Sequence, residues 1–330
     1  MRGALSFFVG EPGVDVTLLA QGRDAGALRD EFAPQNITVA PQASAARRDT
    51  YDAVWFPFNG MRYMPAAPAL VMMHDAFAFT QPHADPIARF REQAPMRRAA
   101  RRAAAIAVQS QWTRGEIQRE LHPGCDPVVI APVADVFFFP AAGDAPPAPL
   151  DAVPYVLIVG VREPRKNAAL AVQACARALR DPETLVVVGE LSNDDRALAQ
   201  RLGVRCGEVA ASDNVLRALY RNARLVLVPS LAEGFGLVAA EALTCGAPVL
   251  ASETSALPET TAGAAVLLDP LDVAAWAAAI RAVLDDSHHA ATLRARTASF
   301  ASADRTSFAR ATLALLRETA ARGAGDGRTR

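Results

Sequence analysis

The chain of 330 residues has few cysteines and no long hydrophobic run. Its four cysteines lie far apart without C-x-x-C spacing, which excludes common zinc and thiol redox motifs and is typical of a reducing compartment. No apolar run reaches the about 18 residues of a membrane-spanning helix, and the run from Leu5 to Val9 is too short for the core of a signal peptide. The sequence therefore predicts a cytoplasmic protein.

An excess of charge of either sign is also missing. The 34 basic and 35 acidic residues give a formal net charge of −1, so nucleic acid is not expected as a partner. Lysine is nearly absent, because Lys166 is the single lysine among the 34 basic residues. Hydrophobic residues make up 51% of the chain, enough for a packed globule. Since one core usually serves roughly 150 residues, two domains are expected.

Short apolar runs alternate with helical segments rich in Ala, Leu and Arg along nearly the whole chain. Runs of this kind are typical of buried parallel strands, so the pattern predicts an α/β fold. The candidate strands are residues 4–9, 14–20, 36–40, 53–57, 69–73, 104–108 and 127–130 in the first half, and 155–160, 184–189, 204–206, 225–229, 248–251 and 265–268 in the second.

A proline-rich stretch from Pro140 to Pro154 has no periodic pattern and indicates a linker, with a boundary near residue 150. The expected domains are residues 1–150 and 151–305. Residues 306–330 form a third segment, a C-terminal helix with the option of packing back on the first domain, followed by a tail. The helical period ends at Ala320, and the tail after Arg322 has nothing apolar to bury, which predicts disorder.

A basic loop between a strand and a helix is the first candidate site. It contains Arg162, Arg165 and Lys166, directly before a helical segment that starts at about Ala168. Free backbone N–H groups and the helix dipole favour an anion at such a place. A solvated loop neutralised by Glu163 is the alternative. The use of the only lysine here favours a diphosphate, because an ammonium is a compact and flexible point charge.

A glycine-bearing turn after the strand at residues 225–229 is the second candidate site. Gly234 and Gly236 allow the close backbone approach that a bound ligand needs, and the helix that follows begins at about Leu237. Glu233 lies in the turn and Glu241 in the helix. The alternative for Glu241 is a solvated helix face, but its neighbours are mostly apolar, and a carboxylate among them usually has a partner or a ligand.

Together these segments resemble a known family. The order is a strand with G-x5-K-N, Y-x-x-A at Tyr220 to Ala223, P-S-x-x-E-G-F-G-L-x-x-x-E-A-L, G-x-P-V, and L-P-E at Leu257 to Glu259. This arrangement is similar to the nucleotide-sugar domain of the retaining glycosyltransferases of family 4, bacterial mannosyltransferases among them. The resemblance implies the GT-B fold, in which two Rossmann-like domains face each other across a ligand cleft.

The resemblance implies roles for residues that match the family's motifs. Lys166 with Arg162 or Arg165 would bind the donor diphosphate, and Glu241 the ribose hydroxyls. Glu233 and the turn that follows it would hold the transferred sugar, with the base near Arg205 to Val209. The expected catalytic residues are His74, Glu233 and Lys166, and the expected donor-binding residues are Arg162, Arg165, Lys166, Glu233, Gly234, Phe235, Gly236, Leu237 and Glu241.

The first half resembles the family less closely. His74, which precedes Asp75 at the end of the strand at residues 69–73, matches a histidine that the family places beside the donor sugar, and the alternative is a structural histidine with satisfied hydrogen bonds next to Asp75. Two features depart from the family pattern. The segment Gly10 to Gly13 is a short version of a glycine-rich loop expected after the first strand, and Ala134 stands where a glycine is common.

Six arginines lie between Arg89 and Arg102 against one acid, Glu92. Such a segment can bind anionic lipid head groups at about 1 kcal/mol per basic residue. This would suit a lipid-linked acceptor and peripheral contact with the inner face of a membrane. A solvated helix face is the alternative.

The resemblance implies a metal-independent, cofactor-free enzyme that transfers a hexose with retention from a nucleotide diphosphate sugar to a hydroxyl of a glycan or lipid-linked glycan. GDP-mannose is slightly favoured over UDP-sugars as donor. The sequence leaves open a sugar-nucleotide epimerase or a phosphorylase of the same architecture. It also leaves open a binding protein without turnover.

Overall fold

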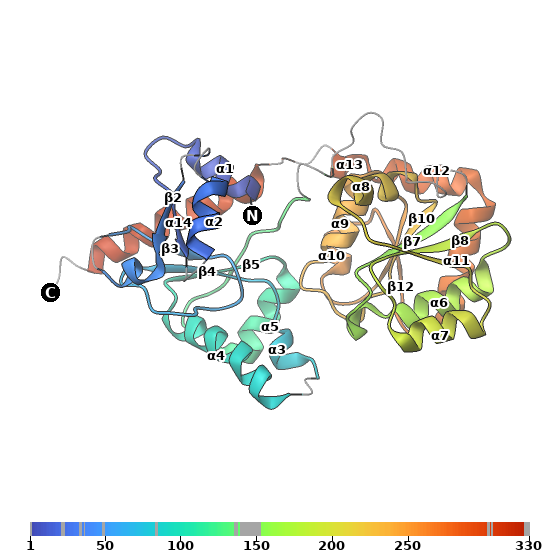
Figure 1. Ribbon diagram of the computed structural model, residues 1–330, viewed down its shortest axis with the longest axis horizontal. Coiled ribbons are helices and arrows are strands. Elements are labelled where there is room, and N and C mark those ends of the chain that lie inside the picture. Colours follow the sequence, from blue (N-terminus) through green and yellow to red (C-terminus); the bar gives the residue numbers. More distant parts are fainter. Residues whose placement is uncertain are drawn as a thin grey trace. The chain divides into compact units, whose positions relative to one another are not determined.

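The computed structural model describes residues 2–20, 24–32, 35, 37–47, 50–82, 85–134, 138, 153–301, 304 and 306–326. The chain forms two compact units (Figure 1). Unit 1 comprises Met1–Pro132 with Arg305–Arg330, and unit 2 comprises Val133–Asp304. The boundary expected near residue 150 lies outside the described residues.

Unit 1 contains two parallel sheets. One pairs β1 with β2, and the other has the order β3-β4-β5-β6. The strands are β1 (Thr17–Ala20), β2 (Thr38–Pro41), β3 (Val54–Phe56), β4 (Ala69–Met73), β5 (Ala105–Val108) and β6 (Val128–Val129). The helices are α1 (Arg2–Val9), α2 (Asp24–Phe32), the 3-10 helix η2 (Gln42–Ala46), α3 (Phe77–Thr80), α4 (Pro86–Arg102), α5 (Gln111–Leu121) and α14 (Ser307–Asp326).

The first element corrects a sequence prediction, because residues 4–9 belong to helix α1 and not to a strand. Leu5 and Phe8 are buried while Ser6 is exposed, so the apolar run packs by one helical face. That face joins a cluster with Leu313 of α14, and Figure 1 shows these first and last helices side by side. The segment Gly10 to Gly13 therefore follows a helix, and it is not the loop after a first strand.

Helix α14 is longer than its sequence pattern indicates. It continues to Asp326, past Ala320, where the predicted helix ends, and residues 327–330 lie outside the described residues. Its buried side chains Ala309 and Leu313 lie one turn apart and pack with α1, whereas Leu315 points to another side and packs with Leu70 and Met72 of β4. The C-terminal helix thus belongs to the core of unit 1.

Unit 2 is a single six-stranded parallel sheet with helices between the strands. Its order is β12-β11-β10-β7-β8-β9. The strands are β7 (Tyr155–Val159), β8 (Thr184–Val188), β9 (Cys206–Val209), β10 (Leu225–Val228), β11 (Val249–Ser252) and β12 (Val266–Leu268). The helices are η4 (Pro164–Lys166), α6 (Ala168–Ala178), α7 (Asn193–Arg201), α8 (Asp213–Asn222), α9 (Leu237–Thr244), α10 (Leu257–Thr261), α11 (Val273–Asp285), α12 (Ser287–Arg296) and α13 (Ala298–Ala301).

Both faces of this sheet are buried, which is why its strands are continuous apolar runs. Alternate residues such as Val156 and Ile158 pack with α6 and α11 on one face, while Tyr155 and Leu157 belong to the cluster that includes α8 and α9. Every predicted strand other than residues 4–9 overlaps a strand of the structure. No helix in the described part of the chain is long and apolar enough to span a membrane.

The strand order of unit 2 reverses between β7 and β10. From β7 the chain winds outward through β8 and β9, and then returns to the other side of β7 with β10, β11 and β12. The loops that leave β7 and β10 at their carboxyl ends therefore turn to opposite sides and open a crevice where such sheets bind ligands. Both candidate sites of the second half lie on these two loops.

Candidate functional site

The loop after β7 is tied to its neighbours by one asparagine. Asn167, which directly follows the short 3-10 helix η4, has left-handed backbone geometry with φ of 55°. Its side-chain nitrogen donates to the carbonyl oxygens of Pro229 (3.1 Å) and Pro270 (2.9 Å), which follow β10 and β12. These bonds hold Arg165 and Lys166, the two residues before it, beside the loop that follows β10.

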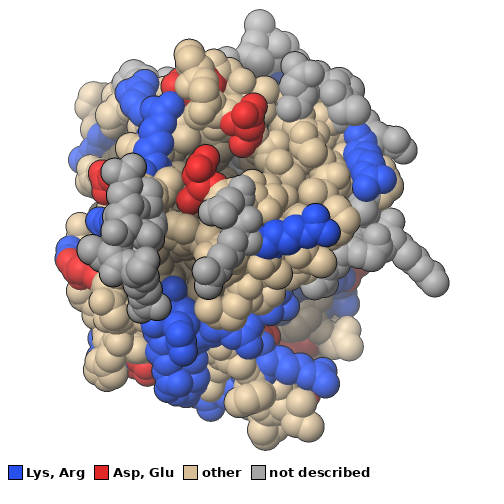
Figure 2. Space-filling model, turned by 90° about the vertical axis from the view of Figure 1, so that its left-hand side faces the viewer, with Lys and Arg blue, Asp and Glu red and all other residues tan. Residues whose placement is uncertain are grey.

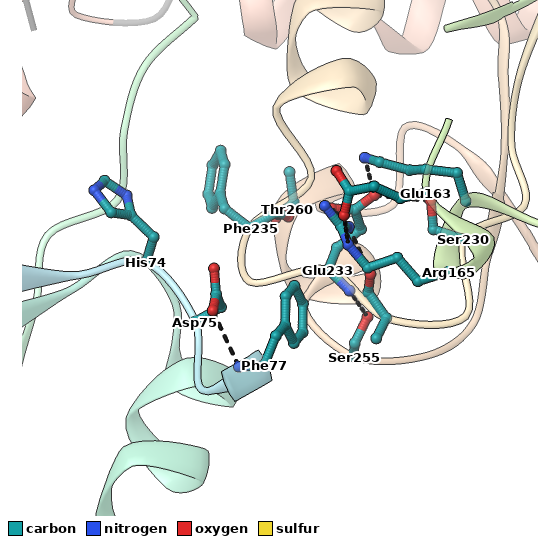
Figure 3. Close-up of polar contacts among 12 residues, drawn as sticks. His74, Asp75, Phe77, Glu163, Arg165, Ser230, Glu233, Phe235, Ser255 and Thr260 are labelled. Carbon is teal, nitrogen blue, oxygen red and sulfur yellow. Dashed lines mark hydrogen bonds and ion pairs between the residues drawn. The ribbon is translucent and has the colours of Figure 1, made fainter. Parts of the chain in front are cut away.

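The carboxylate of Glu233 is the centre of the site. Its side chain is buried, and Lys166 Nζ lies 2.6 Å from Oε1 while an Arg165 guanidinium nitrogen lies 2.9 Å from Oε2. Ser230 Oγ donates to Oε1 at 2.8 Å. Figure 3 shows Arg165 and Ser230 beside this carboxylate, and Ser255 at the backbone nitrogen of Glu233. Two cations from the β7 loop thus meet one acid from the β10 loop.

The charges around Glu233 do not balance within the buried cluster. The side chains of Arg165 and Lys166 are 18% and 14% exposed, whereas Glu163, the other acid on Arg165, is 60% exposed. Burial lowers the pKa of Arg165, but Glu233 and Glu163 more than offset it, so that this pKa is raised and the guanidinium stays charged. The excess positive charge is suited to a phosphate group.

The turn from Glu233 to Gly236 is held from behind by the segment around α10. The backbone N–H of Glu233 donates to Ser255 Oγ at 2.9 Å, and Thr260 Oγ1 donates to the carbonyl of Phe235. Gly236 has φ of +99°, and a Cβ on it would lie 2.7 Å from a methyl carbon of Leu257. Only glycine satisfies both constraints, and the backbone N–H groups of the first turn of α9, Leu237 included, follow directly.

Glu241 lies one turn further along α9 and is half-buried. The hydroxyl of Tyr220 donates to its Oε2 at 3.1 Å. The solvated helix face that the sequence left open for Glu241 therefore does not describe it.

The third basic residue of the β7 loop lies apart from this cluster. The guanidinium of Arg162 pairs with Glu190 at 2.6 Å, with side chains 76% and 67% exposed. Arg205, at the expected base site beside β9, donates to Asp181 and to the carbonyl of Pro182. No group of three or more His, Cys, Asp or Glu side chains that could hold a metal is found among the described residues.

In unit 1, His74 follows β4 and is fixed by its neighbours. Its Nε2 lies 2.7 Å from the carbonyl oxygen of Pro57, and its backbone N–H donates to Asn59 Oδ1 at 2.6 Å. A carbonyl only accepts, so Nε2 carries the proton in this bond. The Asp75 carboxylate accepts from the backbone N–H of Phe77 at 3.0 Å (Figure 3). The structure thus fixes His74 through Pro57.

A cavity of about 530 Å³ lies next to this segment of unit 1. Its lining includes Pro57 and Phe58, which contact His74, together with apolar side chains of α1, β1, β3 and α14 such as Phe8 and Leu313. Arg62, an exposed residue, also lines it. Asp15, which is also exposed, lines it as well, so the cavity is mostly apolar with one charge of each sign at its edge.

The six arginines between Arg89 and Arg102 lie on α4 and divide into two groups. Arg89 donates to the carbonyls of Ala78 and Phe79, and Arg98 to that of Met61, so these two fasten α4 to its own unit. The remaining four, which are exposed, are Arg91, Arg97, Arg101 and Arg102. In Figure 2, Lys and Arg side chains gather in the lower part of the face shown, at the height of α4 in Figure 1. On the same helix Ile87 and Phe90 are 64% and 67% exposed.

Sequence reasoning missed the residues that hold the site together. Asn167, Ser230 and Tyr220 all stand inside the motifs that carry the resemblance, and that membership was their only signal. Ser255 and Thr260 flank the L-P-E motif. Their roles depend on which loops the fold brings together, which spacing along the chain does not show.

Three comparisons place the chain among known proteins. Residues 146–300 match the model of the family "Glycosyl transferases group 1". This part of the chain belongs to that family. The chain is 31% identical over 241 residues to an O-antigen chain mannosyltransferase B of Escherichia coli, and 32% identical over 226 residues to a D-inositol 3-phosphate glycosyltransferase of Acidothermus cellulolyticus. These matches cover 66% and 59% of this chain, and 61% and 49% of the relatives, so the chain spans about half to three-fifths of their length.

The fold comparison extends over both units. The structure of HepE of Anabaena, in complex with UDP and glucose, matches 96% of each chain with a TM-score of 0.72 at 18% identity. At this identity the likeness concerns the fold alone. It confirms the expected GT-B fold.

We predict that Gly236→Ala destabilises unit 2 by more than the cost of a left-handed alanine, about 1–2 kcal/mol, because Leu257 must also shift. Urea unfolding measures the loss. Gly203→Ala is the matched control, since Gly203 has φ of +66° with open space around it and tests backbone strain alone. Equal losses in the two variants would show that contact with Leu257 is unimportant.

Proposed function

We propose that the chain is a retaining hexosyltransferase that moves a sugar from a nucleotide diphosphate donor to a hydroxyl of a glycan or lipid-linked glycan. The observation that carries this proposal is the buried Glu233 carboxylate bound by Arg165 and Lys166 at the strand-order reversal of unit 2. Membership of residues 146–300 in the group 1 family supports it.

The reaction breaks the bond between the anomeric carbon and the diphosphate oxygen and forms a bond to the acceptor oxygen. The acceptor proton goes to the diphosphate, whose developing negative charge is stabilised by Lys166, Arg165 and the N-terminus of α9 at Leu237. Arg162 would add a more distant charge. This scheme uses no metal, and metal-independent transfer stays a prediction.

GDP-mannose remains the favoured donor over UDP-sugars. The mannosyltransferase relative supports mannose as the sugar, whereas the base rests on the sequence resemblance. A thermal-shift panel of GDP, UDP, GDP-mannose and UDP-glucose tests this choice, because a ligand that binds only the folded state raises the melting temperature.

Lys166→Ala is the direct test of the diphosphate role. We expect donor affinity by calorimetry to fall at least about tenfold, the scale of a lost charge-assisted hydrogen bond, and slow donor hydrolysis without acceptor to fall with it. Lys166→Arg should restore only part of the donor affinity and of the hydrolysis rate, since the planar guanidinium of arginine does not replace the point charge of an ammonium. Wild-type affinity in Lys166→Ala would contradict the diphosphate role. A wild-type chain that binds donor but never hydrolyses or transfers it would be a binding protein.

Glu233→Gln and Glu241→Gln should affect different steps, the first mainly turnover and the second mainly nucleotide binding. Loss of the Glu241 charge should weaken binding of the bare nucleoside diphosphate, because this residue is assigned to the ribose. Loss at Glu233 should lower kcat more than it changes the affinity for that ligand, as expected for contacts made mainly in the transition state. Calorimetry and steady-state kinetics on both variants check this split, and the same pattern in both would refute separate roles.

His74→Ala tests whether unit 1 contributes to the chemistry. We predict at least about tenfold slower transfer, the scale of one lost hydrogen bond of roughly 1.4 kcal/mol, with nucleotide affinity unchanged. Because His74 also bonds Pro57, the melting temperature is measured on the same preparation. A variant that melts early but transfers normally per folded molecule would assign His74 a structural role only.

The acceptor is proposed to be lipid-linked, and the chain to bind the inner face of a membrane through α4. The apolar cavity of unit 1 supports an acceptor with an apolar part. The exposed Ile87 and Phe90, beside four exposed arginines, form the apolar and basic surface that anionic bilayers attract.

Sedimentation with vesicles tests the membrane proposal. Replacing Arg91, Arg101 and Arg102 with Gln should weaken binding to phosphatidylglycerol-containing vesicles about a hundredfold, at about 1 kcal/mol per residue. The control replaces the exposed Arg177, Arg180 and Arg201 of unit 2, which changes the net charge equally. Equal weakening by both triple variants would argue against a specific surface on α4.

A further inference from the structure

The bond between Tyr220 and Glu241 joins two helices of unit 2. Tyr220 lies in α8 and its side chain is fully buried, while Glu241 lies in α9 and is half-buried. The phenol oxygen and Glu241 Oε2 are 3.1 Å apart. A phenol donates one hydrogen bond, and a carboxylate has two oxygens that together accept up to about four.

The ring of Tyr220 is fixed by its surroundings. It packs edge-on against Phe138 at 6.0 Å between ring centroids, and it shares a buried cluster with Leu243 of α9. The residue before it, Leu219, accepts a hydrogen bond from the hydroxyl of Tyr155 at 2.8 Å through its backbone carbonyl. The hydroxyl of Tyr220 therefore has a fixed place from which it reaches α9.

The protonation of Tyr220 suits a donor. Burial, followed by the adjacent Glu241 charge, holds the pKa of Tyr220 well above its ordinary value of 10.0. The phenol therefore keeps its proton at neutral pH and presents a donor to the carboxylate. A carboxylate held in one rotamer also loses less entropy when it binds a pair of hydroxyls.

We propose that Tyr220 is a positioning residue, which holds the Glu241 carboxylate in the orientation that accepts the two ribose hydroxyls of the donor. This inference rests on the ribose role of Glu241 in the proposed function. The tyrosine itself touches no substrate. Its contribution is to fix the side chain that does.

Tyr220→Phe removes only the hydroxyl and leaves the ring. Calorimetry compares GDP and UDP with their 2′,3′-dideoxy counterparts, which lack the hydroxyls that Glu241 would bind. For the base that wild type binds more tightly, we expect Tyr220→Phe to lose about tenfold in affinity for the ribonucleotide and nothing for the dideoxynucleotide. In kinetics, KM for the donor should rise with kcat unchanged.

Tyr155→Phe is the matched control. It also removes a buried tyrosine hydroxyl from the same cluster, but its partner is the carbonyl of Leu219 and not Glu241. It should lower the stability of the fold, and it should not change the affinity for the ribonucleotide relative to the affinity for the dideoxynucleotide. Unfolded molecules lower the fitted stoichiometry and not the fitted affinity, so the comparison holds even where Tyr220→Phe is less stable.

The outcomes separate this inference from the function on which it rests. If Glu241→Gln loses ribonucleotide affinity and Tyr220→Phe does not, the positioning role is refuted and the ribose role stands. If Tyr220→Phe loses both nucleotides equally, its role is structural and the inference is likewise refuted. If Glu241→Gln loses no more affinity for the ribonucleotide than for the dideoxynucleotide, the ribose role of Glu241 is refuted, and the positioning role of Tyr220 is refuted with it. If both Glu241→Gln and Tyr220→Phe lose affinity for the ribonucleotide only, the result supports the ribose role of Glu241 and the positioning role of Tyr220.

Discussion

A buried carboxylate with two cationic partners organises unit 2. An ionised Glu233 could not remain buried without compensation, because taking a charge out of water costs several kcal/mol. Arg165, Lys166 and Ser230 supply that compensation, and they come from two different loops. The loops after β7 and β10 are thereby joined at the reversal of strand order. The hydrogen bonds of Asn167, Ser255 and Thr260 hold the same loops in place.

Much of the fold was readable because both faces of the unit 2 sheet are buried. A strand between two helical layers must be apolar throughout, so its run is short, continuous and bounded by turn residues, as at residues 225–229. The run at residues 4–9 has the same composition but another cause. It is a helix that packs by one face on α14, some 300 residues away in the chain, and composition alone does not show such a contact.

The candidate site was readable only as residue types at motif positions. Composition drew attention to Lys166. The positions of Glu233 and Glu241 drew attention to the turn between them. Which of Arg162 and Arg165 joins Glu233 depends on the η4 turn, which directs Arg165 toward the β10 loop and leaves Arg162 with Glu190. Tyr220 could not be assigned either, since only the packing of α8 against α9 brings its hydroxyl to Glu241.

The single lysine of the chain differs from the arginine beside it in how firmly it is held. Arg165 donates to Glu163, to Glu233 and to the carbonyl of Ala232, so its planar fork is engaged on several sides. Within the described residues, the ammonium group of Lys166 donates to Glu233 alone. An ammonium has three donors on a flexible stem, so it can turn toward a phosphate while Arg165 continues to neutralise the buried acid. A second arginine at position 166 would bring a rigid fork to the place where the charge has to move. Arg165 thus neutralises the buried acid while Lys166 is able to turn to the phosphate. These separate roles give a physical reason why a chain whose other basic residues are all arginine has a lysine here.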